Sequence, residues 1–137
     1  MLNLLTAIKS KFSGSALSTD VGGRIYLEDQ APQKAQFPYV VYFVVSGVPE
    51  RTFTERYTNT LIQFSLFSAS GGATEIATMY NDLKTLFDEC SLTITSNSLV
   101  WMREANITTM LNDVTTVDGL QTVKHWACDY ELLTSLS

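Results

Sequence analysis

The fold is decided by the stretch Tyr39-Val-Val-Tyr-Phe-Val-Val-Ser46, in which β-branched and aromatic side chains follow one another without a polar break. Such side chains favour strands, and the missing alternation predicts a strand covered on both faces, by helices or by a partner. Pro38 comes just before this stretch, and Gly47-Val48-Pro49 ends it. We therefore predict a strand over residues 39–46.

A second strand is predicted at Leu61–Ser68, where Ile62, Phe64 and Leu66 alternate with smaller or polar residues. It should form a hairpin with the first strand. The connection, about residues 47–60, is expected to be a long flexible loop. Its residues include Arg51, Phe53, Arg56 and Tyr57. Arginine and aromatic side chains are enriched at protein interfaces, so this loop is predicted to contact a neighbouring subunit or another protein.

Two segments have the apolar spacing of amphipathic helices. Residues 2–13 place Leu2, Leu5, Ile8 and Phe12 on one face, and the segment Ala73–Cys90 has a similar stripe. Between the first helix and the deciding strand, residues 14–23 are small and turn-prone, and residues 24–27 are expected to form a short strand.

A second hairpin is predicted from Leu99–Asn112 and Leu120–Leu132, with its turn at Asp113–Gly119. Simple alternation places apolar groups on both faces of the first of these strands: Leu99, Trp101, Ala105 and Ile107 on one, and Val100, Met102 and Met110 on the other. Such a strand is either central and covered twice or pressed against another subunit.

These elements predict an α+β fold in one domain over residues 1–137. The expected sheet is mixed or mostly antiparallel, with four to five strands and two helices packed on one face, in the order α-β-β-β-α-β-β. No internal repeat or domain linker interrupts the chain.

The formal net charge is −5, and it is distributed unevenly. Residues 1–60 hold six basic and five acidic groups, whereas residues 61–137 hold three basic and nine acidic groups. This balance argues against a protein that grips nucleic acid. The longest apolar run has only the length of a strand, and the amino terminus lacks a secretory pattern, so we expect no membrane segment and a cytoplasmic site of synthesis.

No catalytic, cofactor-binding or metal-binding residues are predicted. His125 and Cys128 are three apart on a strand and point to opposite faces, and His125 lies about 13 Å along the strand from Asp129. The turn at residues 70–72 lacks the lysine of a nucleotide-binding loop. Cys90 and Cys128 are expected to stay free thiols. We therefore expect a protein that is not an enzyme and uses no cofactor.

Several segments together resemble the tail-terminator or tail-completion proteins of tailed bacteriophages. The most specific of them is the strand with Arg24-Ile25-Tyr26, followed by Ala31-Pro32, a spacer and Pro38-Tyr-Val-Val-Tyr42. The resemblance continues over nearly the whole chain, in the opening helix, in Ile62-Gln-Phe-Ser-Leu-Phe67, in the helix 73–90 and in Asp118-Gly119 with His125, Trp126 and Tyr130.

The resemblance implies a small α+β subunit that forms a hexameric ring on the tail tube, halts its polymerisation and presents a surface to the head connector or stopper protein. The location would be the head-proximal end of the virion tail, after assembly in the host cytoplasm. DNA would only pass through the lumen, without specific binding. A negative lumen would suit that passage. The acidic residues expected there are Asp113, Asp118, Asp129 and Glu131.

Two other functions remain open at this stage. The first is another neck or minor tail adapter in the same particle, because small α+β subunits with such roles share this composition. The second, of a different class, is a small ligand-binding domain or enzyme with an apolar pocket between sheet and helices. It would need a convergent group of polar side chains.

Overall fold

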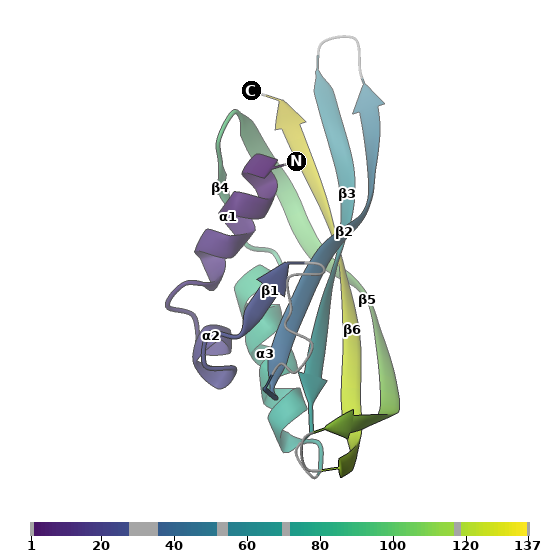
Figure 1. Cartoon of the computed structure of the whole chain (residues 1–137). Helices are drawn as coiled ribbons and strands as arrows, with labels where there is room; N and C mark the ends of the chain where they lie inside the picture. Colours follow the sequence, from purple (N-terminus) through teal and green to yellow (C-terminus); the bar gives the residue numbers. More distant parts are fainter. Residues whose placement is uncertain (1, 28–35, 52–54, 70–71, 117–118, 137) are drawn as a thin grey trace.

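The computed structural model describes residues 2–27, 36–51, 55–69, 72–116 and 119–136, with side chains for all of these except 112–116, 119–121 and 136. Figure 1 shows the helices beside one long, curled sheet. In chain order the elements are α1 (Leu2–Phe12), α2 (Ala16–Asp20), β1 (Ile25–Leu27), β2 (Tyr39–Arg51), β3 (Arg56–Ser68), α3 (Thr74–Phe87), β4 (Thr93–Ile94), β5 (Asn97–Thr116) and β6 (Gly119–Leu136).

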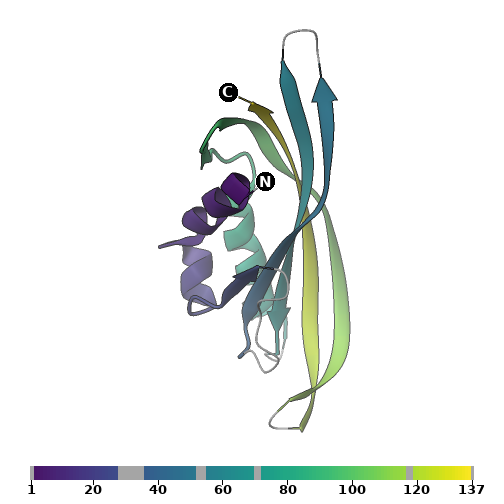
Figure 2. The same ribbon diagram turned by 45° about the horizontal axis from the view of Figure 1, so that its top comes forward.

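The sheet has six strands in the order β1-β2-β3-β6-β5-β4. All neighbours are antiparallel except β1 and β2, which run parallel. The β2–β3 hairpin extends past the helices at one end, and the β5–β6 hairpin extends past them at the other (Figures 1 and 2). The sheet is therefore much longer than the helical layer that covers its middle.

All three helices pack on the same face of the sheet (Figures 1 and 2). The core between them is rich in aromatic rings, and Phe12 of α1, Phe64 of β3 and Phe87 of α3 lie within 5.9 Å of one another, centroid to centroid. Phe64 and Phe87 have no exposed surface. The apolar stripes of the two longer helices thus seal one face of the sheet, where burial of large rings contributes most to stability.

The prediction of an α+β fold is confirmed, but the number of elements is larger than expected. There are six strands rather than four or five, because the two-residue β4 adds an edge to β5. There are three helices, because the turn-prone segment contains the single helical turn α2. Its N-cap is Ser15, whose hydroxyl accepts the amide of Ser18 at 3.1 Å, and Leu17 is fully buried.

The expected long loop at residues 47–60 is wrong. Most of this segment continues the hairpin, with Gly47 opposite Thr60 and the ladder running on to Arg51 opposite Arg56. Glycine, proline and charged residues predicted a break because they weaken strands when taken one by one. Pairing along the neighbouring strand overrides those preferences. Residues 52–54, which include Phe53, lie outside the described part of the chain.

The faces expected for β5 are wrong for Trp101 and Met102, which lie between two bulges, whereas Leu99, Ile107 and Met110 lie on the faces expected for them. The register shifts between Leu99 and Trp101 and again between Glu104 and Asn106. Each extra residue moves the following side chains to the opposite face. As a result the helix-covered face receives Leu99, Met102, Glu104 and Ile107, and the other face receives Trp101, Arg103, Asn106, Thr108 and Met110.

Candidate assembly surface

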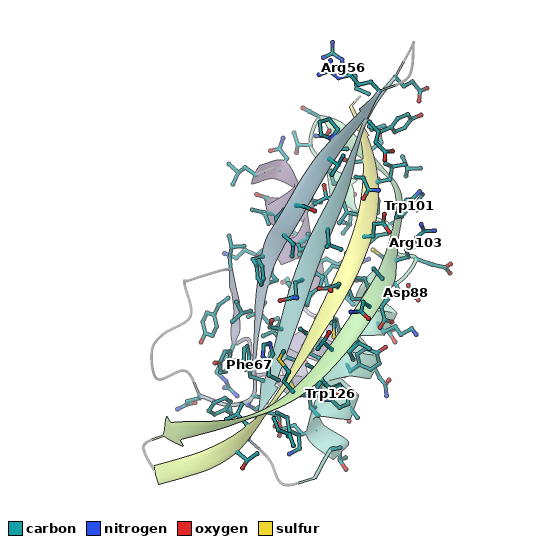
Figure 3. The ribbon with its side chains drawn as sticks, turned by 90° about the vertical axis from the view of Figure 1, so that its right-hand side faces the viewer. Arg56, Phe67, Asp88, Trp101, Arg103 and Trp126 are labelled. Atoms are coloured by element: carbon teal, nitrogen blue, oxygen red, sulfur yellow. The ribbon has the colours of Figure 1, made fainter. Side chains whose placement is uncertain are left out.

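The face of the sheet opposite the helices carries no described element, and we call it the open face. Figure 3 looks directly onto it, with Phe67, Trp101 and Arg103 labelled. The deciding strand β2 is therefore covered by helices on one side only. The pairing of the strands shows which side chains lie on the open face. They are Tyr39, Val41 and Phe43 of β2, every second residue of β3 from Asn59 to Phe67, and every second residue of β6 from His125 to Leu133.

An aromatic row crosses the open face near the end where β2 begins. Phe67 stacks on Tyr39 at 4.7 Å and on His125 at 4.3 Å, and Tyr26 of β1 extends the row with its ring 6.2 Å from Tyr39. Burial lowers the pKa of His125, so its imidazole is neutral at pH 7. The row is uncharged and rigid, which suits packing against another surface.

The middle of the open face carries hydrogen-bonded polar pairs. Gln63 donates to Asp129 at 2.9 Å, and Asn59 donates to Glu131 at 2.8 Å. Arg103 lies 3.9 Å from Glu131. Asp129 and Glu131 are thus on the face opposite the core, and each carboxylate accepts a hydrogen bond from an amide on the adjacent strand.

Arg103 also lies over the ring of Trp101, with 4.1 Å between its guanidinium carbon and the ring centroid. Both residues are on β5, next to its first bulge at Val100, whose side chain is 50% exposed. A cation over an indole ring is a modest attraction at an exposed site. Tryptophan and arginine are also the residues that most often dominate binding at interfaces.

Three of the four predicted interface residues, Arg51, Arg56 and Tyr57, come together at the end of the β2–β3 hairpin. Arg51 and Arg56 are direct cross-strand partners, both exposed, and Tyr57 occupies the next rung opposite Glu50. Arg56 is labelled at the far end of the sheet in Figure 3. Two like charges opposite each other destabilise a hairpin slightly, so this pair is better suited to a partner than to the fold.

The predicted lumen residues are not brought to one place. Asp129 and Glu131 lie on the open face, whereas Asp113 is opposite Thr122 at the far end of the β5–β6 hairpin, and its side chain is outside the described part. Asp118 lies outside the described residues altogether. A single subunit has no lumen, so their common role stays a proposal.

Sequence reasoning missed the junction between the end of α3 and β5. Asp88 accepts the backbone amide of Glu104 at 3.1 Å, and the amide of Glu89 donates to the carbonyl of Met102 at 2.7 Å. The helix dipole disfavours two acidic residues at the carboxyl end of a helix. Here Asp88 and the Glu89 backbone bind one edge of β5 instead, and no local pattern reveals that.

Glu104 anchors the same junction from the strand. Its carboxylate accepts the hydroxyl of Tyr80 at 2.7 Å and pairs with Lys84 at 3.4 Å. The hydrogen bond and burial raise the pKa of Tyr80 to about 12. This network fixes α3 against β5 on the covered side of the sheet.

A carboxyl pair joins α2 to α3. Burial, together with a hydrogen bond to Asp82 and its charge, raises the pKa of Asp20 to about 6. Asp20 therefore keeps its proton to a higher pH than an isolated carboxyl does.

The described residues contain no obvious chemistry beyond these contacts. Cys90 and Cys128 are free thiols, as expected, and burial raises the pKa of Cys128 to about 12. Among the described residues no three His, Cys, Asp or Glu side chains gather as metal ligands. None of the described helices has the length and apolar character needed to cross a membrane.

A groove of about 200 Å³, open to solvent, lies between α1 and the β1–β2 edge. Lys9 is the cationic side chain in its lining, which otherwise consists of Leu2, Leu5, Thr6, Ile25, Leu27 and Tyr42. This lining offers no convergent polar group of the kind an enzyme site requires.

Comparison with known proteins agrees with the arrangement of elements. The family model described as "Tail completion protein gp17" matches residues 4–135. A chain of the structure titled "Virion of native gene transfer agent (GTA) particle" shares the fold with a TM-score of 0.75 and 13% identity, over 95% of this chain and 92% of that chain. A second solved structure shares it with a TM-score of 0.52 and 16% identity, over 95% and 93%. No protein of curated function matches.

Proposed function

Because the chain belongs to the tail completion protein gp17 family, which places it among the structural proteins of phage tails, we propose that it caps the growing tail tube. In this proposal several copies, six in the simplest case, form a ring on the tube end. The ring stops polymerisation and offers its other side to the head connector. The subunit works in the virion at the head-proximal end of the tail.

The observation that carries the proposal is the family match over residues 4–135, nearly the whole chain. The open face supports it. A capping ring needs one surface for its lumen and another for a partner protein, and the described chain offers an uncovered sheet face and a projecting hairpin. In the proposed ring Asp129 and Glu131 face the lumen, where negative charge lets DNA pass without adhesion.

Electron microscopy of the protein, alone and mixed with the tail-tube protein of its own virion, tests the proposal. Rings on tube ends and tubes that stop growing at a fixed length are the expected result. Tubes that elongate equally with and without the protein would contradict it.

The arginines at the end of the hairpin can be tested in the same assay. Replacing Arg51 and Arg56 with alanine removes both charges from an exposed rung, so capping should weaken at least ten-fold while the melting temperature stays within a few degrees. Lys9→Ala, which removes an exposed charge from α1, is the matched control and should cap normally. Normal capping by the double arginine variant would show that the end of the hairpin does not contribute to capping.

A further inference from the structure

The two edges of the sheet are each covered over only one half. β1 covers β2 from Val40 to Tyr42, which leaves residues 45–51 of β2 without a described neighbour on that side. On the opposite edge β4 covers the start of β5, and Asp88 and Glu89 cover it as far as Glu104. Residues 105–111 of β5 have no described neighbour beyond β6.

Apart from the bulge at Ala105, where it begins, the free stretch of β5 lacks the features that usually keep edge strands from pairing. Residues 105–111 read Ala-Asn-Ile-Thr-Thr-Met-Leu, with no charge and no proline, and Leu111 is 70% exposed. Natural sheets protect such edges with charges, prolines, bulges or covering elements. Beyond the bulge at Ala105, alternation directs the amides and carbonyls of Ile107, Thr109 and Leu111 outward.

The free stretch of β2 offers a matching edge. The amide of Val40 donates to the carbonyl of Arg24, so the backbone groups of Val40 point to the β1 edge. Every second residue of β2 points the same way, and the bulge at Val45 shifts this pattern by one residue. Beyond the bulge, the backbone groups of Gly47, Pro49 and Arg51 therefore point outward. Val45 and Val48 are 48% and 54% exposed, and the first charged residue of the stretch is Glu50. Pro49 has no amide to donate, so this edge supports only a short ladder.

We propose that the free edge of β5 pairs with the free edge of β2 in a second copy of this chain, which continues the sheet from subunit to subunit. The proposal rests on the self-assembly in the proposed function and specifies its contact. β2 and β5 run in opposite directions within the sheet, so copies in the same orientation meet as antiparallel strands. The contact joins two different surfaces, as a closed ring requires.

The offset between the two free stretches along the strands suits a sheet that closes into a ring of subunits. Their midpoints, Val48 and Thr108, are level with Asn59 and Ser65 of β3, which are six residues apart (59 to 65). This stagger is about 20 Å along the strands, against about 19 Å across one repeat of four strand spacings, from β2 to β2 of the next copy. Strands in a closing sheet would then tilt by roughly 45°, close to the 35–45° typical of closed sheets.

Centring the two stretches on each other gives a definite register. Gly47 faces Thr109 as a hydrogen-bonded pair, and Val48 faces Thr108 as a pair without mutual hydrogen bonds, whose side chains both lie on the open face. Val45 then comes level with Leu111, so the exposed apolar groups of the two edges are buried against each other.

Cysteine crosslinking tests this register in the full chain. The double variant V48C/T108C should form a head-to-tail series of disulfide-linked multimers on mild oxidation, because such pairs bring side chains closest. V48C and T108C alone, and V48C/S98C with its second cysteine on the part of β5 that β4 covers, should give no such series. Non-reducing gel electrophoresis of the protein, concentrated alone and bound to tubes, reads the result.

Blocking the edge gives an independent measurement. The variant T109P removes an outward-pointing amide and leaves the hydrogen bonds between β5 and β6 in place. Oligomers and rings should therefore be lost, while the circular dichroism spectrum stays that of the wild type. The matched control T109A keeps the amide and should assemble normally. Rings that persist in T109P, without crosslinks in V48C/T108C, would overturn the edge contact and leave tube capping intact. Crosslinked multimers of a protein that does not bind tubes would contradict only the proposed capping function. Absence of multimers, crosslinks and rings together would overturn both.

Discussion

The two faces of one sheet are used differently in this protein. On the covered face, side chains such as Phe64, Ile62 and Tyr130 have no exposed surface, and they pack against three helices. On the open face, side chains at alternate positions of the same strands are half-buried, and their contacts are cross-strand stacks and amide–carboxylate pairs. One face therefore holds the fold together, whereas the other satisfies its polar and aromatic groups along the sheet and stays free of a covering layer of described elements.

The largest expected effect separates the two faces directly. Phe64→Ala removes a ring that contacts Phe12, Tyr42, Phe87 and Tyr130, and the cavity should lower the free energy of unfolding by about 3–5 kcal/mol. Phe67→Ala, on the open face, should lower it by roughly 1–2 kcal/mol because the ring is only partly buried. Urea denaturation measures both. Equal losses would mean that the open face contributes as much to the fold as the core.

A smaller effect contrasts two tyrosines on the covered side. Tyr80→Phe removes the hydrogen bond to Glu104 and should cost about 1–2 kcal/mol of unfolding free energy. The buried hydroxyl of Tyr130 has no partner among the described residues, so Tyr130→Phe should change stability by less than about 0.5 kcal/mol or raise it. Thermal melts of the two variants test this order. A larger loss for Tyr130→Phe would reveal a partner for its hydroxyl.

The smallest effect depends on pH. The open-face carboxylates have amide donors, whereas Asp20 faces another carboxyl, Asp82, and its raised pKa of about 6 means that the folded state binds a proton more tightly than the unfolded state. The stability from this proton is complete below about pH 4 and is lost as the pH rises through 6.

Asp20→Asn should therefore melt a few degrees higher than the wild type at pH 7.5, and this advantage should disappear by about pH 4.5. Asp82→Asn removes the same repulsion and should flatten the same pH range. Melting temperatures measured from pH 4 to 8 decide the point. Parallel curves for the wild type and both variants would show that the two carboxyls are not linked in solution.

Local pattern predicted most of the fold. The apolar spacing of residues 2–13 and 73–90 predicted α1 and α3, because an amphipathic stripe is a property of neighbouring residues. The strands around Tyr39 and Leu61, and the second hairpin, were predicted from composition in the same way. The assignment of His125 and Cys128 to opposite faces of β6 is also confirmed, since it needs only the two-residue period of a strand.

The residues of the candidate assembly surface were harder to predict from the sequence than the fold was. Residue type alone singled out Arg51, Arg56 and Tyr57. Their expected loop is instead part of a hairpin, because β2 and β3 pair along this segment, and that pairing depends on residues far apart in the chain. The bulges at Val100 and Ala105 reversed the faces of the β5 residues between them, and no local signal marks an extra residue in a ladder. The use of Asp88 on the β5 edge was missed for the same reason: its partner, Glu104, is 16 residues away.

The sequence by itself determined which segments are helical or extended, which charges the chain carries and to which family it is similar, because these depend on residue types and their spacing. Only the tertiary structure decided the order of the six strands, which halves of the edge strands stay free and which face stays open. Those features arise from hydrogen bonds and packing between residues far apart in the chain, where a shift of one residue exchanges core for surface.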